Sequence, residues 1–278
     1  MTLTKSSSCL WLMQCVSTAL AVELNVFNSG DLLIKAQKEN ELIPVLSEQY
    51  PELDVETAYR VQKAYALRRL TADQIAGFKA GLTSTEIQKK FGVTFPVSGV
   101  LFASGRKLDS PIIDKSMFKM LMIETEIGFV VGKPITHPPK NVSELRSSIK
   151  AVMPVIELPD IGFTDLKTLK AVDIIAANVS SSQFIVGTEK DAMSLDLNNI
   201  TGTLSLNGHV VNQGKGSDAL GDQWNAALWL VNVITKQGWT IEPGYILITG
   251  VLGKMIHGKK GKYIADFGGL GKISFEIR

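Results

Sequence analysis

Apolar and polar positions recur at helical spacing near the start of this chain and in short strand-like runs over most of its remainder. Between residues 54 and 70, apolar side chains return every three or four positions, which predicts a helix beginning near Asp54 or Val55. An earlier helix is predicted after Asp31, with the Asp31 carboxylate as its cap. The same spacing over residues 223–236 predicts one long helix within strand-rich sequence.

Short apolar or β-rich runs, separated by Gly, Pro and Asn/Asp turns, predict the strands. These runs are residues 123–131, 152–158, 182–186, 202–206, 245–249 and 273–277. A helical beginning followed by strands with one inserted helix predicts an α+β fold. We expect a helical N-terminal part over residues 22–95 and a strand-rich, metal-binding core over residues 96–278.

A pair of carboxylates lies within the apolar run 123–131. On a strand, Glu124 and Glu126 share one face, roughly 7 Å apart at about 3.4 Å per residue. In a cleft their mutual repulsion requires a cation or a proton. Glu157 follows another apolar run, and three carboxylates suit a hard divalent ion such as Mg²⁺. The alternative is that Glu124 and Glu126 line the wet face of an antiparallel strand.

Composition excludes some functions. The 278 residues are 45% hydrophobic and 20% charged, with a net charge of +2, which is ordinary for a folded globular protein. The longest basic cluster, residues 254–262, is preceded by Gly253 and interrupted by Gly258 and Gly261, so nucleic-acid binding has no compositional support. The apolar stretch 9–21 is too short to span a bilayer.

The first 21 residues have the character of a signal segment. Lys5 precedes the apolar stretch, which ends in Ala19-Leu20-Ala21, a small-x-small pattern typical of signal peptidase sites. This pattern predicts cleavage before Val22 and export to the periplasm. The alternative is an ordinary buried helix in a cytoplasmic protein. Both cysteines of the chain, Cys9 and Cys15, lie in this segment.

From about Asp31 to its C-terminus the chain resembles the 2-keto-4-pentenoate hydratase and 4-oxalocrotonate decarboxylase branch of the fumarylacetoacetate hydrolase superfamily. Each shared motif is weak alone, and their order along the chain makes the resemblance specific. They include Gly77-Phe78-Lys79-Ala80-Gly81-Leu82-Thr83-Ser84, Glu124-Thr125-Glu126-Ile127, Val152-Met153-Pro154-Val155-Ile156-Glu157, Asn178-Val179-Ser180-Ser181, Ile248-Thr249-Gly250 and Ala265-Asp266-Phe267-Gly268-Gly269-Leu270-Gly271.

The resemblance implies mixed, twisted sheets rolled around a central site with a smaller helical N-terminal part. It implies Mg²⁺ or Mn²⁺ held by Glu124, Glu126 and Glu157, a small 2-oxo acid as substrate, and a homo-oligomer. Lys79 is the expected proton-transfer residue, because burial beside a divalent cation lowers a lysine pKa toward neutrality. The expected substrate-binding residues are Thr83, Ser84, Ser180, Thr249 and Gly250.

Three departures from the family pattern bear on the reaction. Val97 stands where hydratases usually have aspartate, Gly162 stands where an arginine is usual, and Ala177 replaces a second aspartate. Decarboxylases also have an apolar residue at the first place, so Val97 favours decarboxylation over hydration. The expected function is a metal-dependent lyase of either type. The alternative is an exported, non-catalytic paralogue that only binds 2-oxo acids.

Overall fold

The structure is a computed structural model that describes residues 24–108 and 110–278. The predicted signal segment, residues 1–21, lies outside the described residues. Within those residues, no helix combines the length and the apolar character that crossing a bilayer requires. The helices are α1 Val26–Lys38, α2 Leu46–Gln49, α3 Val55–Arg69, α4 Thr85–Lys90, α5 Val142–Arg146, α6 Ala171–Ala176 and α7 Gln223–Lys236.

The strands form two sheets. Their bounds are β1 Ile75–Gly81, β2 Val97–Phe102, β3 Arg106–Lys107, β4 Ile112–Ile113, β5 Met122–Val131, β6 Ile149–Leu158, β7 Gln183–Val186, β8 Thr201–Leu206, β9 His209–Lys215, β10 Ile246–Ile248, β11 Ile256–His257, β12 Gly261–Asp266 and β13 Lys272–Ile277. The larger sheet has the order β2-β1-β10-β5-β6-β7-β3, with β11 also paired to β5. The smaller sheet has the order β4-β13-β12-β8-β9.

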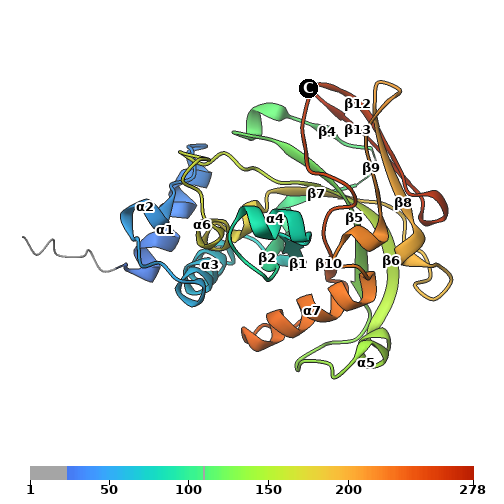
Figure 1. The fold of residues 1–278 in the computed structure, drawn as a ribbon, viewed down its shortest axis with the longest axis horizontal. Helices are drawn as coiled ribbons and strands as arrows, with labels where there is room; N and C mark the ends of the chain where they lie inside the picture. The colour runs from blue at the N-terminus through green and yellow to red at the C-terminus, as the bar shows by residue number, and fades with distance from the viewer. Residues whose placement is uncertain (1–23, 109) are drawn as a thin grey trace, which may run out of the picture.

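Both sheets are mixed, since β1–β10, β3–β7 and β4–β13 pair in parallel and the other neighbours pair antiparallel. The helices α1, α2, α3 and α6 gather at one side of the molecule, and the smaller sheet lies at the other (Figure 1). The α+β prediction is confirmed. Strand β1, which falls within the predicted helical part 22–95, belongs to the same sheet as strands from residues 96–278.

Two helix starts test the capping predictions. Helix α3 begins as predicted, because the Asp54 side chain accepts a hydrogen bond from the Thr57 N–H at 2.7 Å. The prediction for the first helix is wrong at its start. Helix α1 begins five residues before Asp31 and is capped by Asn25, while Asp31 lies inside it and pairs with Arg68 at 2.8 Å.

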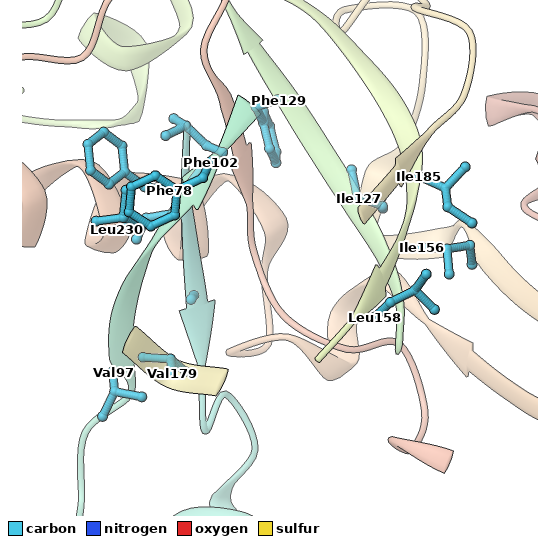
Figure 2. Close-up of a cluster of buried hydrophobic side chains, with 14 of the residues drawn as sticks. Phe78, Val97, Phe102, Ile127, Phe129, Ile156, Leu158, Val179, Ile185 and Leu230 are labelled. Atoms are coloured by element: carbon cyan, nitrogen blue, oxygen red, sulfur yellow. The ribbon is translucent and has the colours of Figure 1, made fainter. Parts of the chain in front are cut away.

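The core divides according to the two faces of the larger sheet. One face packs against the helices and the smaller sheet, and it carries Phe78, Ile127, Phe129 and Ile156 among many others (Figure 2). The opposite face forms a separate apolar cluster inside the curl of the larger sheet. That inner cluster is Ala76, Leu101, Val130, Ala151, Met153, Val155, Phe184, Val186, Ile246 and Ile248.

Candidate metal centre

The inner face of β5 carries two carboxylates before it becomes apolar. Because side chains alternate along a strand, Glu124 and Glu126 share their face with Val130 of the inner cluster, while Ile123 and Ile127 point to the main core. Glu124 is also paired with Glu157 across the β5–β6 ladder. Residues directly opposite in antiparallel strands have neighbouring side chains, so the pairing itself brings the third carboxylate to the first two.

The three carboxylates meet within one small volume. One oxygen from each of Glu124, Glu126 and Glu157 lies within 4.8 Å of the other two. Glu126 and Glu157 are almost completely buried, at 1% and 0% exposure, and Glu124 is partly exposed. This burial differs from the alternative expectation of a solvated strand face. The partial exposure of Glu124 makes it the member of the cluster nearest solvent.

Lys79 reaches this cluster from a distant strand. Its Nζ forms an ion pair with Glu157 Oε1 and donates a second hydrogen bond to the Val179 carbonyl oxygen at 3.1 Å. Two strands, β10 and β5, separate β1 from β6, so a flat sheet would hold Lys79 and Glu157 roughly 14 Å apart. The curl of the sheet closes that distance, and it buries Lys79 to 2% exposure.

The charges of the cluster do not balance without a cation. Burial, and then the neighbouring Glu157 charge, raise the pKa of Glu124 to about 8. Burial followed by the charges of Glu157 and Glu124 also raises the pKa of Glu126 well above its ordinary value. Burial acts to lower the pKa of Lys79, but the three carboxylates outweigh it and hold that pKa above its usual value. Without an ion, the pKa of Lys79 is therefore raised, which is opposite to the lowering that we expect beside a cation.

Two observations fit a divalent ion at this place. Three ionised carboxylates and one ammonium sum to a charge of −2, which a single divalent cation neutralises. Glu157 Oε2 is buried without a hydrogen-bond partner among the described residues, and a buried carboxylate oxygen of this kind is costly unless something binds it. The ligand set is composed only of carboxylate oxygens, which are the ligands that Mg²⁺ and Mn²⁺ accept.

Gly250 contacts the centre through its backbone. Its N–H donates to Glu126 Oε2 at 2.8 Å. The φ of Gly250 is +120°, and a Cβ there would lie 2.3 Å from Thr83 Oγ1, so only glycine lets the loop approach. The structure thus brings together two of the predicted substrate-binding residues, Gly250 and Thr83, beside a predicted metal ligand.

The other predicted substrate-binding hydroxyls differ in how they are engaged. Ser84 Oγ accepts from the Ile87 N–H and caps α4. Thr249 Oγ1 donates to Gln223 Oε1 at 2.6 Å, so this buried hydroxyl is part of an internal network. Ser180 is buried, and it directly follows Val179, whose carbonyl accepts from Lys79.

The sequence interpretation did not assign a role to Val179 or Asn178. Val179 acts through its main-chain oxygen, which no side-chain pattern reveals. Asn178 lies in one of the motifs shared with the family, but the motif alone assigns it no role. Its side chain binds the backbone of Val100. Among the departures, Val97 is fully buried and lies beside Val179 (Figure 2).

With this geometry established, comparisons define the class of protein. Residues 93–277 match the family Fumarylacetoacetate (FAA) hydrolase C-terminal. A 2-keto-4-pentenoate hydratase from Paraburkholderia xenovorans (strain LB400) is 30% identical over 248 residues, covering 88% of this chain and 92% of that protein. Another 2-keto-4-pentenoate hydratase, from Paraburkholderia phymatum, is 32% identical and covers 87% and 93%. The chain belongs to the fumarylacetoacetate hydrolase family.

One solved structure shows which branch of the family the chain resembles in its fold. The 4-oxalocrotonate decarboxylase from Pseudomonas putida G7, complexed with magnesium and adipate, matches with a TM-score of 0.87 at 26% identity. The match covers 92% of this chain and 99% of that one. The resemblance to the hydratase and decarboxylase branch is thereby confirmed, and so is the prediction of an enzyme of that general type. All the relatives named here are enzymes, so the non-catalytic alternative finds no support among them.

Proposed function

We propose that this protein is a divalent-metal-dependent lyase of the 2-keto-4-pentenoate hydratase type, acting on a small 2-oxo acid or its dienol. The observation that carries the proposal is the buried cluster of Glu124, Glu126 and Glu157 with Lys79 paired to it. The hydratases at 30% and 32% identity support the reaction type. The decarboxylase complexed with magnesium supports the choice of ion.

Glu124, Glu126 and Glu157 would hold the ion. A bound divalent cation supplies a Lewis acid that polarises the 2-oxo group and stabilises the charge of its enolate form. Such an ion would also offset the charge of −2 that the four side chains carry together, and its positive charge would oppose the effects that raise the pKa of Glu124 and Glu126.

The side chain of Lys79 moves the proton in this proposal. As a dienol becomes the conjugated ketone, its enol O–H proton is lost and a C–H bond forms at the far end of the diene, which needs an acid within reach. Lys79 Nζ is held by two acceptors, Glu157 and the Val179 carbonyl, and burial excludes competing solvent. Water then adds to the carbon–carbon double bond of the ketone, giving the hydrated product.

A specific observation favours decarboxylation as the second candidate. Val97, the apolar residue shared with decarboxylases, is fully buried beside Val179, so no carboxylate stands at this point to orient a water molecule. The 4-oxalocrotonate decarboxylase similarity covers nearly the whole described chain. In this reaction the carbon–carbon bond to the departing carbon dioxide breaks, its electron pair passes into the conjugated 2-oxo system, and a divalent cation held by the three glutamates would stabilise the resulting charge.

One experiment separates the candidates. Purified protein with Mg²⁺ is given 2-hydroxypenta-2,4-dienoate and, separately, 4-oxalocrotonate, and the loss of dienol absorbance and the release of carbon dioxide are followed. A hydratase consumes the first compound and forms a hydroxylated 2-oxo acid. Turnover of the second compound alone would assign the decarboxylase. Binding of both compounds without turnover of either would reject the enzyme proposal.

A further inference from the structure

A strained turn lies beside Lys79. Asn178, Val179 and Ser180, between α6 and β7, have φ angles of 54°, 51° and 56°, all in the left-handed region. This region crowds the Cβ of residues other than glycine, and a β-branched residue such as Val179 is an outlier there. Backbone strain of this kind persists only where surrounding contacts impose it. The contacts of the turn must therefore hold it in place.

The side chain of Asn178 supplies two of those contacts, and the Asp160 N–H, which donates to the Ser180 carbonyl oxygen at 3.0 Å, supplies another. Asn178 Oδ1 accepts from the Val100 N–H at 2.7 Å, and its Nδ2 donates to the Val100 carbonyl at 2.9 Å. Val100 belongs to β2, the edge strand of the larger sheet, and both residues are 1% exposed. The amide of Asn178 thus pairs with the free edge of β2 as a neighbouring strand would, and it satisfies two buried backbone groups.

Two glycines make room for the turn against the sheet. A Cβ at Gly99 would lie 2.9 Å from the Asn178 carbonyl oxygen, and a Cβ at Gly81 would lie 2.5 Å from Val179 Cγ1. Both glycines are close to Lys79 in the sheet, since Gly81 lies two residues after it on β1 and Gly99 is its partner in the β1–β2 ladder. The turn is therefore fitted to the backbone around Lys79.

We propose that Asn178 is a positioning residue for Lys79. By clamping the left-handed turn to β2, it fixes the Val179 carbonyl that accepts from Lys79 Nζ at 3.1 Å. The Lys79 ammonium is then held between this carbonyl and Glu157, which fixes the direction of its remaining N–H. The inference rests on the proposed function in so far as Lys79 transfers the proton.

The competing explanation is that Asn178 only satisfies the buried edge of β2. Asn178→Ala removes both hydrogen bonds, and Asn178→Gly removes them while also relieving the left-handed strain, so the second variant is the one more readily folded. Asn207→Ala is the matched control. Asn207 is likewise left-handed, with φ of 50°, and its Oδ1 accepts from the Lys262 N–H at 3.0 Å, but it lies in the β8–β9 turn.

Three measurements are made on each variant with full-length protein. They are kcat and KM for whichever compound the wild type turns over, Mg²⁺ affinity by calorimetry, and the ¹H–¹⁵N signal of the Lys79 ammonium in ¹⁵N-lysine-labelled protein. Lys79→Met assigns that signal by its disappearance. The ammonium signal reports how Lys79 is held, whether or not the protein is active.

Positioning predicts that both Asn178 variants lose at least about tenfold in kcat, while KM and Mg²⁺ affinity change by less than about threefold. Their Lys79 signal shifts or broadens, and Asn207→Ala leaves kcat and the signal unchanged. If the Asn178 variants lose only thermal stability, with kcat and the signal as in the control, the proposal is overturned. If the wild type has no turnover, the proposed function fails separately, and the signal alone decides on Asn178.

Discussion

The inner face of β5 and β6 is charged at one end and apolar at the other. Glu124, Glu126 and Glu157 occupy one end, while Val130 and Met153 lie toward the other, on the same face of the same strands. Burial of the apolar end stabilises the fold, whereas burial at the charged end is unfavourable for ionised carboxylates and raises the pKa of Glu124 and Glu126. Fold stability and chemistry therefore reside in separate lengths of the same two strands.

The largest effect is expected at the charged end, from Lys79→Met. Losing a general acid–base group lowers turnover by about 10²–10⁴-fold, so the variant should be almost inactive in a steady-state assay with saturating Mg²⁺. Thermal melts accompany the assay, because removing one partner of a buried ion pair also destabilises the fold.

The matched control for Lys79 is Lys63→Met. Lys63 also donates to a backbone carbonyl, that of Gln237 at 2.9 Å, and lies over the Trp239 ring. It is on α3, away from the carboxylates, so its loss should leave kcat unchanged. Equal activity losses in both variants would mean that the effect of Lys79→Met arises from destabilisation rather than from proton transfer.

The apolar end should respond in stability rather than activity. Met153→Ala leaves a cavity in the inner cluster, and we expect a loss of about 2–5 kcal/mol in the free energy of unfolding, measured by urea denaturation. Activity per folded molecule should stay close to wild type. Met193→Ala, at a methionine that is 55% exposed, is the control and should be nearly neutral. A strong loss of kcat in Met153→Ala at full folding would show that the two ends are coupled.

Metal binding provides the next test of the comparison. Mg²⁺ should raise the melting temperature of the wild type. At a free Mg²⁺ concentration of one hundred times Kd, the free energy of unfolding should increase by about 2.7 kcal/mol. Glu126→Gln should lose this response while keeping an oxygen acceptor for the Gly250 N–H. Without metal the variant should be at least as stable as the wild type, since glutamine removes a carboxyl group whose ionisation is opposed by burial. The surface variant Glu189→Gln should retain the full response, and a retained response in Glu126→Gln would exclude Glu126 as a ligand.

Much of the fold followed from local patterns. Helix α7 has the predicted bounds, residues 223–236, and β5 lies within one residue of its predicted range. Strand β1 was missed because it is buried along most of its length and contains two glycines, so it shows no alternation of apolar and polar residues. The start of α1 was missed because Asp31 is also compatible with a position inside a helix.

The candidate site was only partly accessible from spacing. Alternation on one strand is enough to place Glu124 and Glu126 on a common face. Lys79 meets Glu157 only because the sheet curls across four strands, and no local pattern encodes that curl. Glu157 was proposed as a third ligand because it follows an apolar run, whereas Lys79 was assigned through family resemblance. The turn at Asn178 had no local signal, since valine at position 179 disfavours the left-handed backbone that it adopts.

The smallest expected effect is the pH dependence of the charged end. Glu124, with a pKa of about 8, retains its proton at pH 7 in the metal-free protein, and that proton must leave before the carboxylate binds Mg²⁺. Apparent Mg²⁺ affinity should therefore rise from pH 6 to pH 8, by up to about tenfold per pH unit for each proton released, and level off above pH 8.

Stability without metal should move in the opposite direction over the same range. A carboxyl group whose pKa is raised in the folded state binds more protons folded than unfolded, so the free energy of unfolding falls as pH rises from about 4.5 toward 8. Calorimetric Mg²⁺ titrations and urea denaturation at half-unit pH intervals measure both trends. Glu124→Gln should weaken the pH dependence of both the Mg²⁺ affinity and the free energy of unfolding. Glu144→Gln, on helix α5, should leave both pH dependences unchanged. If the Mg²⁺ affinity of the wild type does not change between pH 6 and pH 9, Glu124 is already ionised before the metal binds.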